Sequence, residues 1–178
     1  SHGEVIDTTN PAAPERAGVI VDPEINVWHQ SDPVTLEDPI LGKRDFIVVE
    51  DEVAGATGTG QCPNGGVHIY DATGDLEQAP VKVGYWNIDD IAARDALDTC
   101  TAHVFDIHED AKKMTIAWYN GGVHVVDLSG LAGISIGIAD AAAARIEGSN
   151  SPTPSNTTST CESPCRSVPA SAPRAGTT

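Results

Sequence analysis

The sequence predicts an all-β protein built from repeated units of four short antiparallel strands. The first observation is a near-duplicate: residues 64–71 (NGGVHIYD) return at residues 120–127 as NGGVHVVD. Repetition at this spacing is typical of repeat architectures. The second is that the chain contains short runs rich in Val, Ile and aromatic residues, bounded by Gly, Pro, Asn and Asp, which favour strands.

The first predicted unit, residues 1–24, is a degenerate copy with two strands. Residues 5–7 (VID) match residues 69–71 (IYD), and an apolar strand follows the proline at position 14. The same succession of strand, proline and strand occurs near residue 80. The unit therefore holds the third and fourth strands of a repeat.

The second predicted unit, residues 27–88, holds all four strands. Its first strand opens at His29, its second is the apolar run 45–49, its third is the Gly-Gly-Val-His element, and its fourth follows Pro80. We expect the third unit, residues 100–138, to hold most of a further repeat in the same order.

In that third unit the first strand opens at His103, which answers His29, and residues 113–117 answer residues 45–49. Asn-Gly-Gly before each third strand supplies the positive φ angles that a tight hairpin requires.

Side-chain alternation in the third strand indicates a sheet covered on both faces. Val67 and Ile69 point to one side, and His68 and Tyr70 to the other, so that both faces are apolar or amphipathic. A propeller blade is covered in this way by its neighbours. An ordinary β-sandwich with two similar hairpins is the alternative.

Residues 100–108 (CTAHVFDIH) and 118–129 (WYNGGVHVVDLS) resemble the LVIVD-repeat family. The members are bacterial and archaeal surface or secreted proteins whose repeats are taken to build a β-propeller. The resemblance covers residues 3–130 and implies an extracytoplasmic location at the cell surface or in secreted form. It implies no activity, because one fold hosts many functions.

The resemblance implies an incomplete β-propeller of about two to two and a half blades over residues 1–138. A ring needs at least four blades of roughly 40 to 45 residues, which is more than this region offers. Three explanations are a fragment of a longer protein, an array completed by another chain, and a smaller sheet structure. We favour the fragment, with missing blades from a longer chain or an oligomer.

Residues 148–178 are rich in Ser, Thr, Pro and Ala and contain no aromatic residue. Such a composition predicts a disordered C-terminal tail, because it buries too little apolar surface to offset the entropy of ordering. A surface-spanning stalk is the functional interpretation, and an unconstrained terminus or a shifted reading frame is the favoured alternative.

The protein is acidic, with a formal net charge of −16, and the excess of acid lies before the tail. This charge disfavours nucleic acid and anionic membranes as partners and favours cations or basic partners. No segment approaches the length of a membrane-spanning helix, so we expect no membrane insertion.

Two cysteines are predicted to form a disulfide. Cys62 lies in the loop between the second and third strands of its unit, and Cys100 lies in the link to the next unit. In a propeller these loops are neighbours on one face, and a disulfide there fits an extracytoplasmic location. Two unrelated thiols are the alternative. Cys161 and Cys165, in the tail, have no histidine nearby, which disfavours a zinc site.

Histidines open the first strand of successive units. A propeller would place His29 and His103 near the mouth of its central channel, where the loop with Glu50, Asp51 and Glu52 adds carboxylates. Such a set could hold a divalent metal, or calcium if carboxylates dominate. We favour a structural role, such as a hydrogen bond to the adjacent blade, and therefore expect no cofactor.

The remaining histidines and two aspartates are predicted to be structural. His68 and His124 lie within strands, where buried polar groups normally find partners. His108 lies in an acidic turn that lacks the spacing of a calcium loop. Asp71 and Asp127 each end a third strand and are expected to cap the following turn.

Standard catalytic motifs are absent: the sequence holds no Gly-x-Ser-x-Gly, no phosphate loop with lysine and no His-Glu-x-x-His. Residues 55–60 (GATGTG) are expected to form a flexible loop. We therefore expect a non-catalytic module that binds a protein or a carbohydrate at one loop face, which carries Glu50, Asp51, Glu52, Asp89 and Asp90. The alternative is a metal-dependent enzyme with His29 and His103 as ligands and Glu52 as general base.

Overall fold

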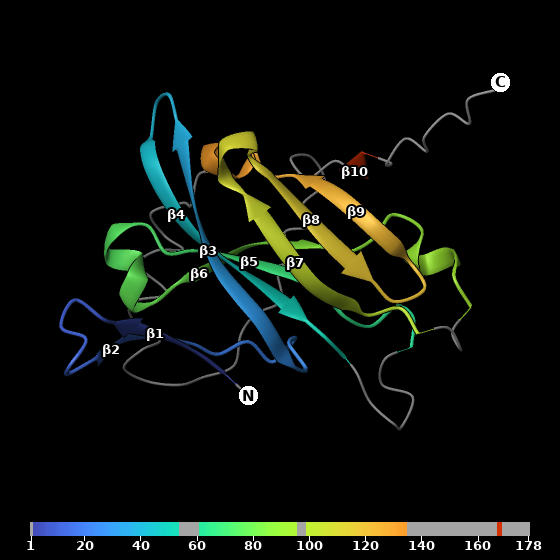
Figure 1. Cartoon of the computed structure of the whole chain (residues 1–178), viewed down its shortest axis with the longest axis horizontal. Helices are drawn as coiled ribbons and strands as arrows, with labels where there is room; N and C mark the ends of the chain where they lie inside the picture. The colour runs from blue at the N-terminus through green and yellow to red at the C-terminus, as the bar shows by residue number, and fades with distance from the viewer. Residues whose placement is uncertain (1, 54–60, 96–98, 135–166, 169–178) are drawn as a thin grey trace, which may run out of the picture.

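The structure, a computed structural model, describes residues 2–53, 61–95, 99–134 and 167–168. It is an all-β protein whose strands pair antiparallel in separate sheets, as the sequence predicted (Figure 1). The predicted tail (148–178, apart from 167–168), the glycine-rich loop (55–60), Cys161 and Cys165 lie outside the described residues. No helix in the described part of the chain has the length and apolar character needed to cross a bilayer.

The first sheet consists of β1 (Gly3–Asp7) and β2 (Glu15–Ile20), which pair antiparallel. These are the two strands expected for the first unit. β2 lies against η1 (Gly74–Gln78), a short 3₁₀ helix. Gly18 permits this approach, because a Cβ there would lie 2.4 Å from the carbonyl oxygen of Glu77.

The second sheet is a four-stranded antiparallel meander in chain order. It consists of β3 (Trp28–Asp38), β4 (Gly42–Asp51), β5 (Gly66–Asp71) and β6 (Val81–Trp86). Every residue of β5 is buried, as expected for a strand covered on both faces.

The third sheet consists of β7 (Ala102–His108), β8 (Lys113–Trp118) and β9 (Gly122–Asp127), with the two-residue β10 (Ser167–Val168) at its edge. A tight turn joins β8 to β9, with φ of 50° at Asn120 and 84° at Gly122. The duplicated Asn-Gly-Gly therefore forms the predicted hairpin here. In the first copy it follows a long connection, and Gly65 (φ 81°) instead lets the backbone approach Thr101.

Strand pairing corrects the alignment of the two repeats by one residue. Asp71 lies opposite Phe46, and its counterpart Asp127 lies opposite Lys113. Phe46, and not Asp45, is thus the equivalent of Lys113. The predicted match of 45–49 with 113–117 was wrong by one residue, because similar apolar runs can be aligned in two registers and only their hydrogen bonding to the third strands decides between them.

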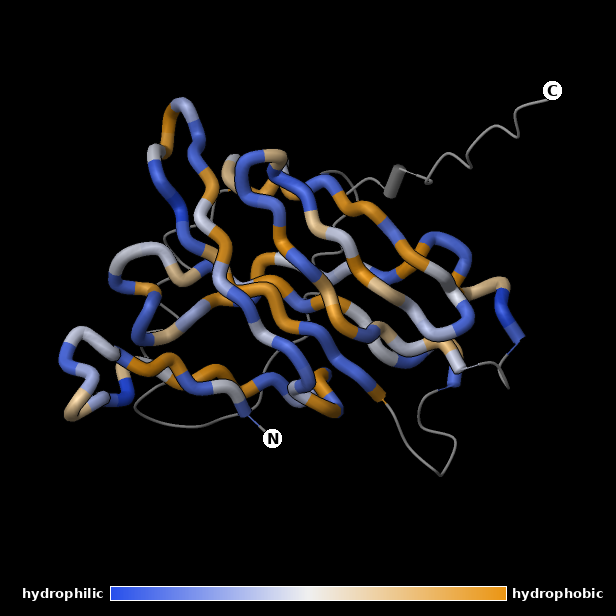
Figure 2. Tube along the Cα trace, in the orientation of Figure 1, coloured by the Kyte–Doolittle hydropathy of each residue, from blue (hydrophilic) through white to orange (hydrophobic). Residues whose placement is uncertain are grey.

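The second and third sheets share one hydrophobic core. The Trp86 and Trp118 rings meet edge to face with centroids 5.5 Å apart. Figure 2 shows the apolar residues concentrated in the strands that cross the middle of the molecule. A smaller core around Val49 and Tyr70 covers the opposite face of the second sheet, towards β2.

Arg44 in β4 is buried between two segments that are distant in the sequence. Its guanidinium pairs with Asp71 in β5 and donates hydrogen bonds to the carbonyl oxygens of Ala132 and Ile134. Arg44 therefore ties the segment at η4 (Leu131–Gly133), which follows the third sheet, back to the second sheet. The sequence analysis did not single out this residue.

Candidate metal centre between two sheets

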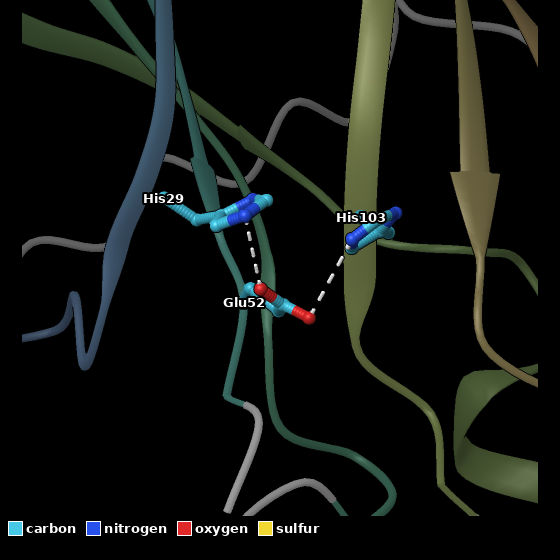
Figure 3. Close-up of side chains that lie close together, drawn as sticks. All are labelled: His29, Glu52 and His103. Atoms are coloured by element: carbon cyan, nitrogen blue, oxygen red, sulfur yellow. Dashed lines mark ion pairs between the residues drawn. The ribbon is translucent and has the colours of Figure 1, made fainter.

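His29, Glu52 and His103 converge where the second and third sheets meet. His29 is the second residue of β3, Glu52 follows β4 directly, and His103 is the second residue of β7. The Glu52 carboxylate lies between the two imidazoles (Figure 3): its Oε2 is 3.2 Å from His29 Nε2 and its Oε1 is 3.7 Å from His103 Nε2.

These separations suit a shared metal ion. The three donor atoms lie within 4.8 Å of one another, and the two imidazoles stack with centroids 5.1 Å apart. Ligands bound about 2.0–2.1 Å from a tetrahedral zinc ion lie about 3.3 Å from each other. A small contraction of the cluster would therefore place all three donors in one coordination sphere.

Glu50 orients the first of these imidazoles. Its Oε2 lies 2.8 Å from His29 Nδ1, and its side chain is fully buried. A carboxylate at Nδ1 holds the proton there and leaves the Nε2 lone pair directed at Glu52. Burial raises the pKa of Glu50 to about 7, although the hydrogen bond with His29 opposes this shift.

Tyr119, in the turn between β8 and β9, contacts the same carboxylate of Glu52. Its hydroxyl donates a hydrogen bond of 3.0 Å to Glu52 Oε1, and its ring meets the His103 ring edge to face at 5.3 Å. The hydrogen bond to Glu52 raises the pKa of Tyr119. The sequence analysis missed this residue, because only strand pairing reveals that it occupies the position equivalent to Glu52.

Thr101 fixes the backbone on both sides of Glu52. Its hydroxyl accepts a 2.7 Å hydrogen bond from the Val53 amide and lies 3.2 Å from the Asp51 carbonyl oxygen. Its own carbonyl accepts a hydrogen bond from the Tyr119 amide at 3.0 Å. The backbone carrying Glu52 is therefore held to the start of β7, two residues before His103.

Cys62 and Cys100 form the predicted disulfide beside this backbone, with Cα atoms 4.8 Å apart. The bond joins the segment before β5 to the segment before β7. It therefore links the second sheet to the third sheet close to the three candidate ligands.

The expected exposed acidic face is only partly present. Glu50 and Asp51 are 0% and 1% exposed. Asp51 accepts hydrogen bonds from the Val27 amide and from the amide and side chain of Asn26, so that it caps the segment before β3. These two carboxylates cannot form a contact surface as predicted, because both are buried and hydrogen-bonded inside the protein.

Of the other three predicted contact residues, Glu52 is only 9% exposed, whereas Asp89 and Asp90 are exposed. Asp90 pairs with Arg94 at 2.8 Å. These aspartates lie in the segment between β6 and η2 (Ile91–Ala93).

A second acidic cluster already contains its own cation. Asp22, Glu24 and His68 lie close enough together to bind a metal. However, the Lys82 ammonium lies 2.8 Å from Asp22 and 2.6 Å from Glu24. The Tyr70 hydroxyl also donates to Asp22, at 2.5 Å. Lys82 thus neutralises this cluster, and we do not assign a metal to it.

The other histidines occupy packing positions. His124 lies 3.0 Å from the Gly121 carbonyl oxygen and packs against Trp86, in agreement with the prediction of a satisfied histidine. His68 is 2% exposed and packs edge to face on Tyr85, but its Nδ1 has no hydrogen-bond partner among the described residues.

Asp71 and Asp127 cap turns as predicted. Their carboxylates accept hydrogen bonds from the amides of Thr73 and Ser129, at 2.8 and 2.9 Å. Each therefore stabilises the turn that follows a third strand.

No family model, characterised protein or solved structure matches this chain. The functional argument therefore rests on the geometry of the residues themselves.

Proposed function

We propose that this chain is a propeller-type repeat module of the LVIVD kind, with a transition-metal site at the joint between two blades. The order of β3 to β6 supports the blade assignment, because four antiparallel strands in chain order form one propeller blade. The third sheet begins with an equivalent strand that also carries a histidine, and it packs on the second sheet.

The convergence of His29, Glu52 and His103 is the observation that carries the metal proposal. The two histidines come from β3 and β7 in two different sheets, Glu52 follows β4 directly, and Glu50 holds one imidazole in the tautomer that a metal requires. Two imidazoles and a carboxylate favour ions such as Zn²⁺, Co²⁺, Ni²⁺ or Cu²⁺. Calcium fits less well, because it takes oxygen ligands.

The role that we propose for the metal is structural rather than catalytic. Glu52, held between both imidazoles, would be a ligand and could not also act as a free general base. An ion there would brace the joint between two blades in a non-catalytic scaffold that binds a protein or glycan partner. The disulfide is consistent with the proposed extracytoplasmic location.

Metal titration tests this proposal. Metal-free, tag-free protein should bind one equivalent of Co²⁺, followed by its d–d absorption, and Zn²⁺, followed by calorimetry. His29→Ala, His103→Ala and Glu52→Gln should each weaken binding by about 100-fold or more, because each removes one of three ligands.

His108→Ala is the matched control, because His108 is exposed and its imidazole lies beside Asp106 and the Thr115 hydroxyl, at 3.8 and 3.1 Å, rather than beside Glu52. It should retain the affinity of the unaltered protein. If the unaltered protein binds no metal, or if His108→Ala loses as much affinity as His103→Ala, the proposed site is wrong. Circular dichroism should establish that each variant is folded.

A further inference from the structure

We propose that Tyr119 is a fourth ligand of this centre and that the complete donor set selects a ferric ion, bound as an iron–phenolate. The inference rests on the proposed metal site and names the ion that this site prefers. It follows from the equivalence of the two repeat units and from the position of the Tyr119 hydroxyl.

In the second sheet, two paired positions lead to the site. Trp28 in β3 lies opposite Asp51 in β4. The residues that follow each of them, His29 and Glu52, direct a nitrogen and an oxygen at one another across 3.2 Å.

The third sheet repeats this arrangement. Ala102 in β7 lies opposite Trp118 in β8, in the same relation as Trp28 and Asp51. The residues that follow are His103 and Tyr119. Each unit therefore contributes one imidazole and one oxygen donor from the same two positions, and both pairs meet at the joint.

The Tyr119 hydroxyl is within reach of an ion held by Glu52. It lies 3.0 Å from Glu52 Oε1, the oxygen that also faces His103 Nε2. A carboxylate oxygen binds a metal at about 2.0–2.2 Å, so an ion on Oε1 would need only a small movement of the phenol to bind it as well. Tyr119 is 41% exposed, which leaves room for this movement.

The donor set suits a trivalent ion. A phenolate and a carboxylate are hard, anionic oxygen donors, which bind Fe³⁺ more strongly than they bind a divalent ion. Together with the two neutral imidazoles they supply two negative charges and leave the ferric site a residual charge of one. On binding, the phenol O–H bond breaks, an Fe–O bond forms and the proton passes to solvent, with no change in oxidation state. A bound cation promotes this deprotonation because it reverses the local electrostatics.

An optical titration tests the proposal. Metal-free full-length protein is titrated with ferric nitrilotriacetate and, separately, with Co²⁺. We expect one equivalent of Fe³⁺ to produce a phenolate-to-iron charge-transfer band in the visible region, with tyrosine modes in its resonance Raman spectrum. Tyr119→Phe should lose the band, and its Co²⁺ affinity should fall by about 10- to 100-fold, less than in His103→Ala, because the two imidazoles and the carboxylate still bind the ion.

Tyr85→Phe is the matched control, because its hydroxyl donates to the Gly65 carbonyl oxygen, at 2.8 Å, rather than to Glu52. It should keep the band. A band that persists in Tyr119→Phe, or unaltered protein that binds Co²⁺ but gives no band with iron, overturns the Tyr119 assignment and leaves the metal site standing. Unaltered protein that binds neither ion overturns both proposals.

Discussion

Three consecutive carboxylates, at and directly after the end of β4, lie on two sides of the chain: Glu50 and Glu52 both contact His29, and Asp51 points away from it. Glu50 turns to His29, Asp51 caps the backbone at Asn26, and Glu52 lies at the joint between the sheets. Alternate residues of a strand point to opposite faces, so neighbours in the sequence are separated in space. A run of acidic residues therefore does not imply an acidic surface.

Glu50→Gln should weaken metal binding without preventing folding. The amide oxygen can still accept from His29 Nδ1, but the negative charge that favours the Nδ1-protonated imidazole is lost. We expect Co²⁺ and Zn²⁺ affinity to fall about 10- to 100-fold, as is typical when the partner of a histidine ligand is altered.

Asp106→Asn is the control for Glu50→Gln, because the Asp106 side chain is 80% exposed and lies further along β7 than the ligand His103. Calorimetry on both variants gives the measurement. Equal affinities for Glu50→Gln and the unaltered protein would show that Glu50 does not position His29.

Because of Asp22, the free energy of unfolding should vary with pH in the acid range. Burial by itself would raise its pKa, but contacts with His68, Lys82 and the Tyr70 hydroxyl outweigh burial and hold the pKa below its ordinary value. A depressed pKa means that the folded state binds fewer protons. The stabilisation is therefore present above the unfolded pKa, near 3.9, and is lost as the pH falls through the folded value.

Asp22→Asn should remove part of this pH dependence. We expect the variant to be about 2–3 kcal/mol less stable at neutral pH, because Lys82 and Tyr70 lose their charged partner. Between about pH 5 and pH 2, its free energy of unfolding should fall less steeply than that of the unaltered protein. Parallel slopes in urea titrations at several pH values would contradict the assignment.

At the residue scale, the sequence predicted the disulfide and the turn-capping aspartates, and it raised His29, Glu52 and His103 as a possible site. It could not reveal Tyr119, Thr101 or the burial of Glu50. The contacts of Tyr119 and Thr101 join different units, and they depend on which residues face each other across two sheets.

At the element scale, the short strands and their order could be predicted from apolar runs and from the duplicated Asn-Gly-Gly. The register could not. The run 45–49 matches 113–117 equally well when shifted by one residue, and only hydrogen bonding to β5 and β9 decides between the alternatives.

Docking of the first sheet on η1 depends on one glycine. Gly18→Ala would place a methyl group 2.4 Å from the Glu77 carbonyl oxygen, in contact with backbone that cannot turn aside. We expect a loss of about 1–3 kcal/mol in the free energy of unfolding, as is typical of overpacking.

Gly133→Ala is a matched substitution in the same protein, because its Cβ would meet nothing closer than 3.8 Å. It should change stability by less than about 1 kcal/mol. Chemical denaturation measures the free energy of unfolding of both variants. Equal losses of stability would argue against close packing between β2 and η1.

At the scale of the whole molecule, the second and third sheets are expected to behave as one folding unit. They share a continuous core, and the disulfide connects them across 38 residues of sequence. Closing a loop of that length stabilises the folded state by about 4 kcal/mol through the entropy of the unfolded chain.

Replacing both cysteines, as Cys62→Ser with Cys100→Ser, should lower the free energy of unfolding by about 3–4 kcal/mol. It should also weaken metal binding, because Cys100 adjoins Thr101, which holds the backbone of Glu52. Denaturant unfolding and calorimetry on the double variant supply the measurements. A variant with unchanged stability would show that the core alone holds the sheets together.

The Arg44 contacts lie near one end of β4, and the disulfide lies beyond the other end. These two fixed points, together with the core that the two sheets share, restrict movement of one sheet relative to the other. The backbone that carries the candidate ligands should then move little when an ion binds, so that the small contraction of the cluster needs only side-chain movement and little conformational entropy is lost. Hydrogen exchange in β4 and β7 should accordingly change little when the metal is added.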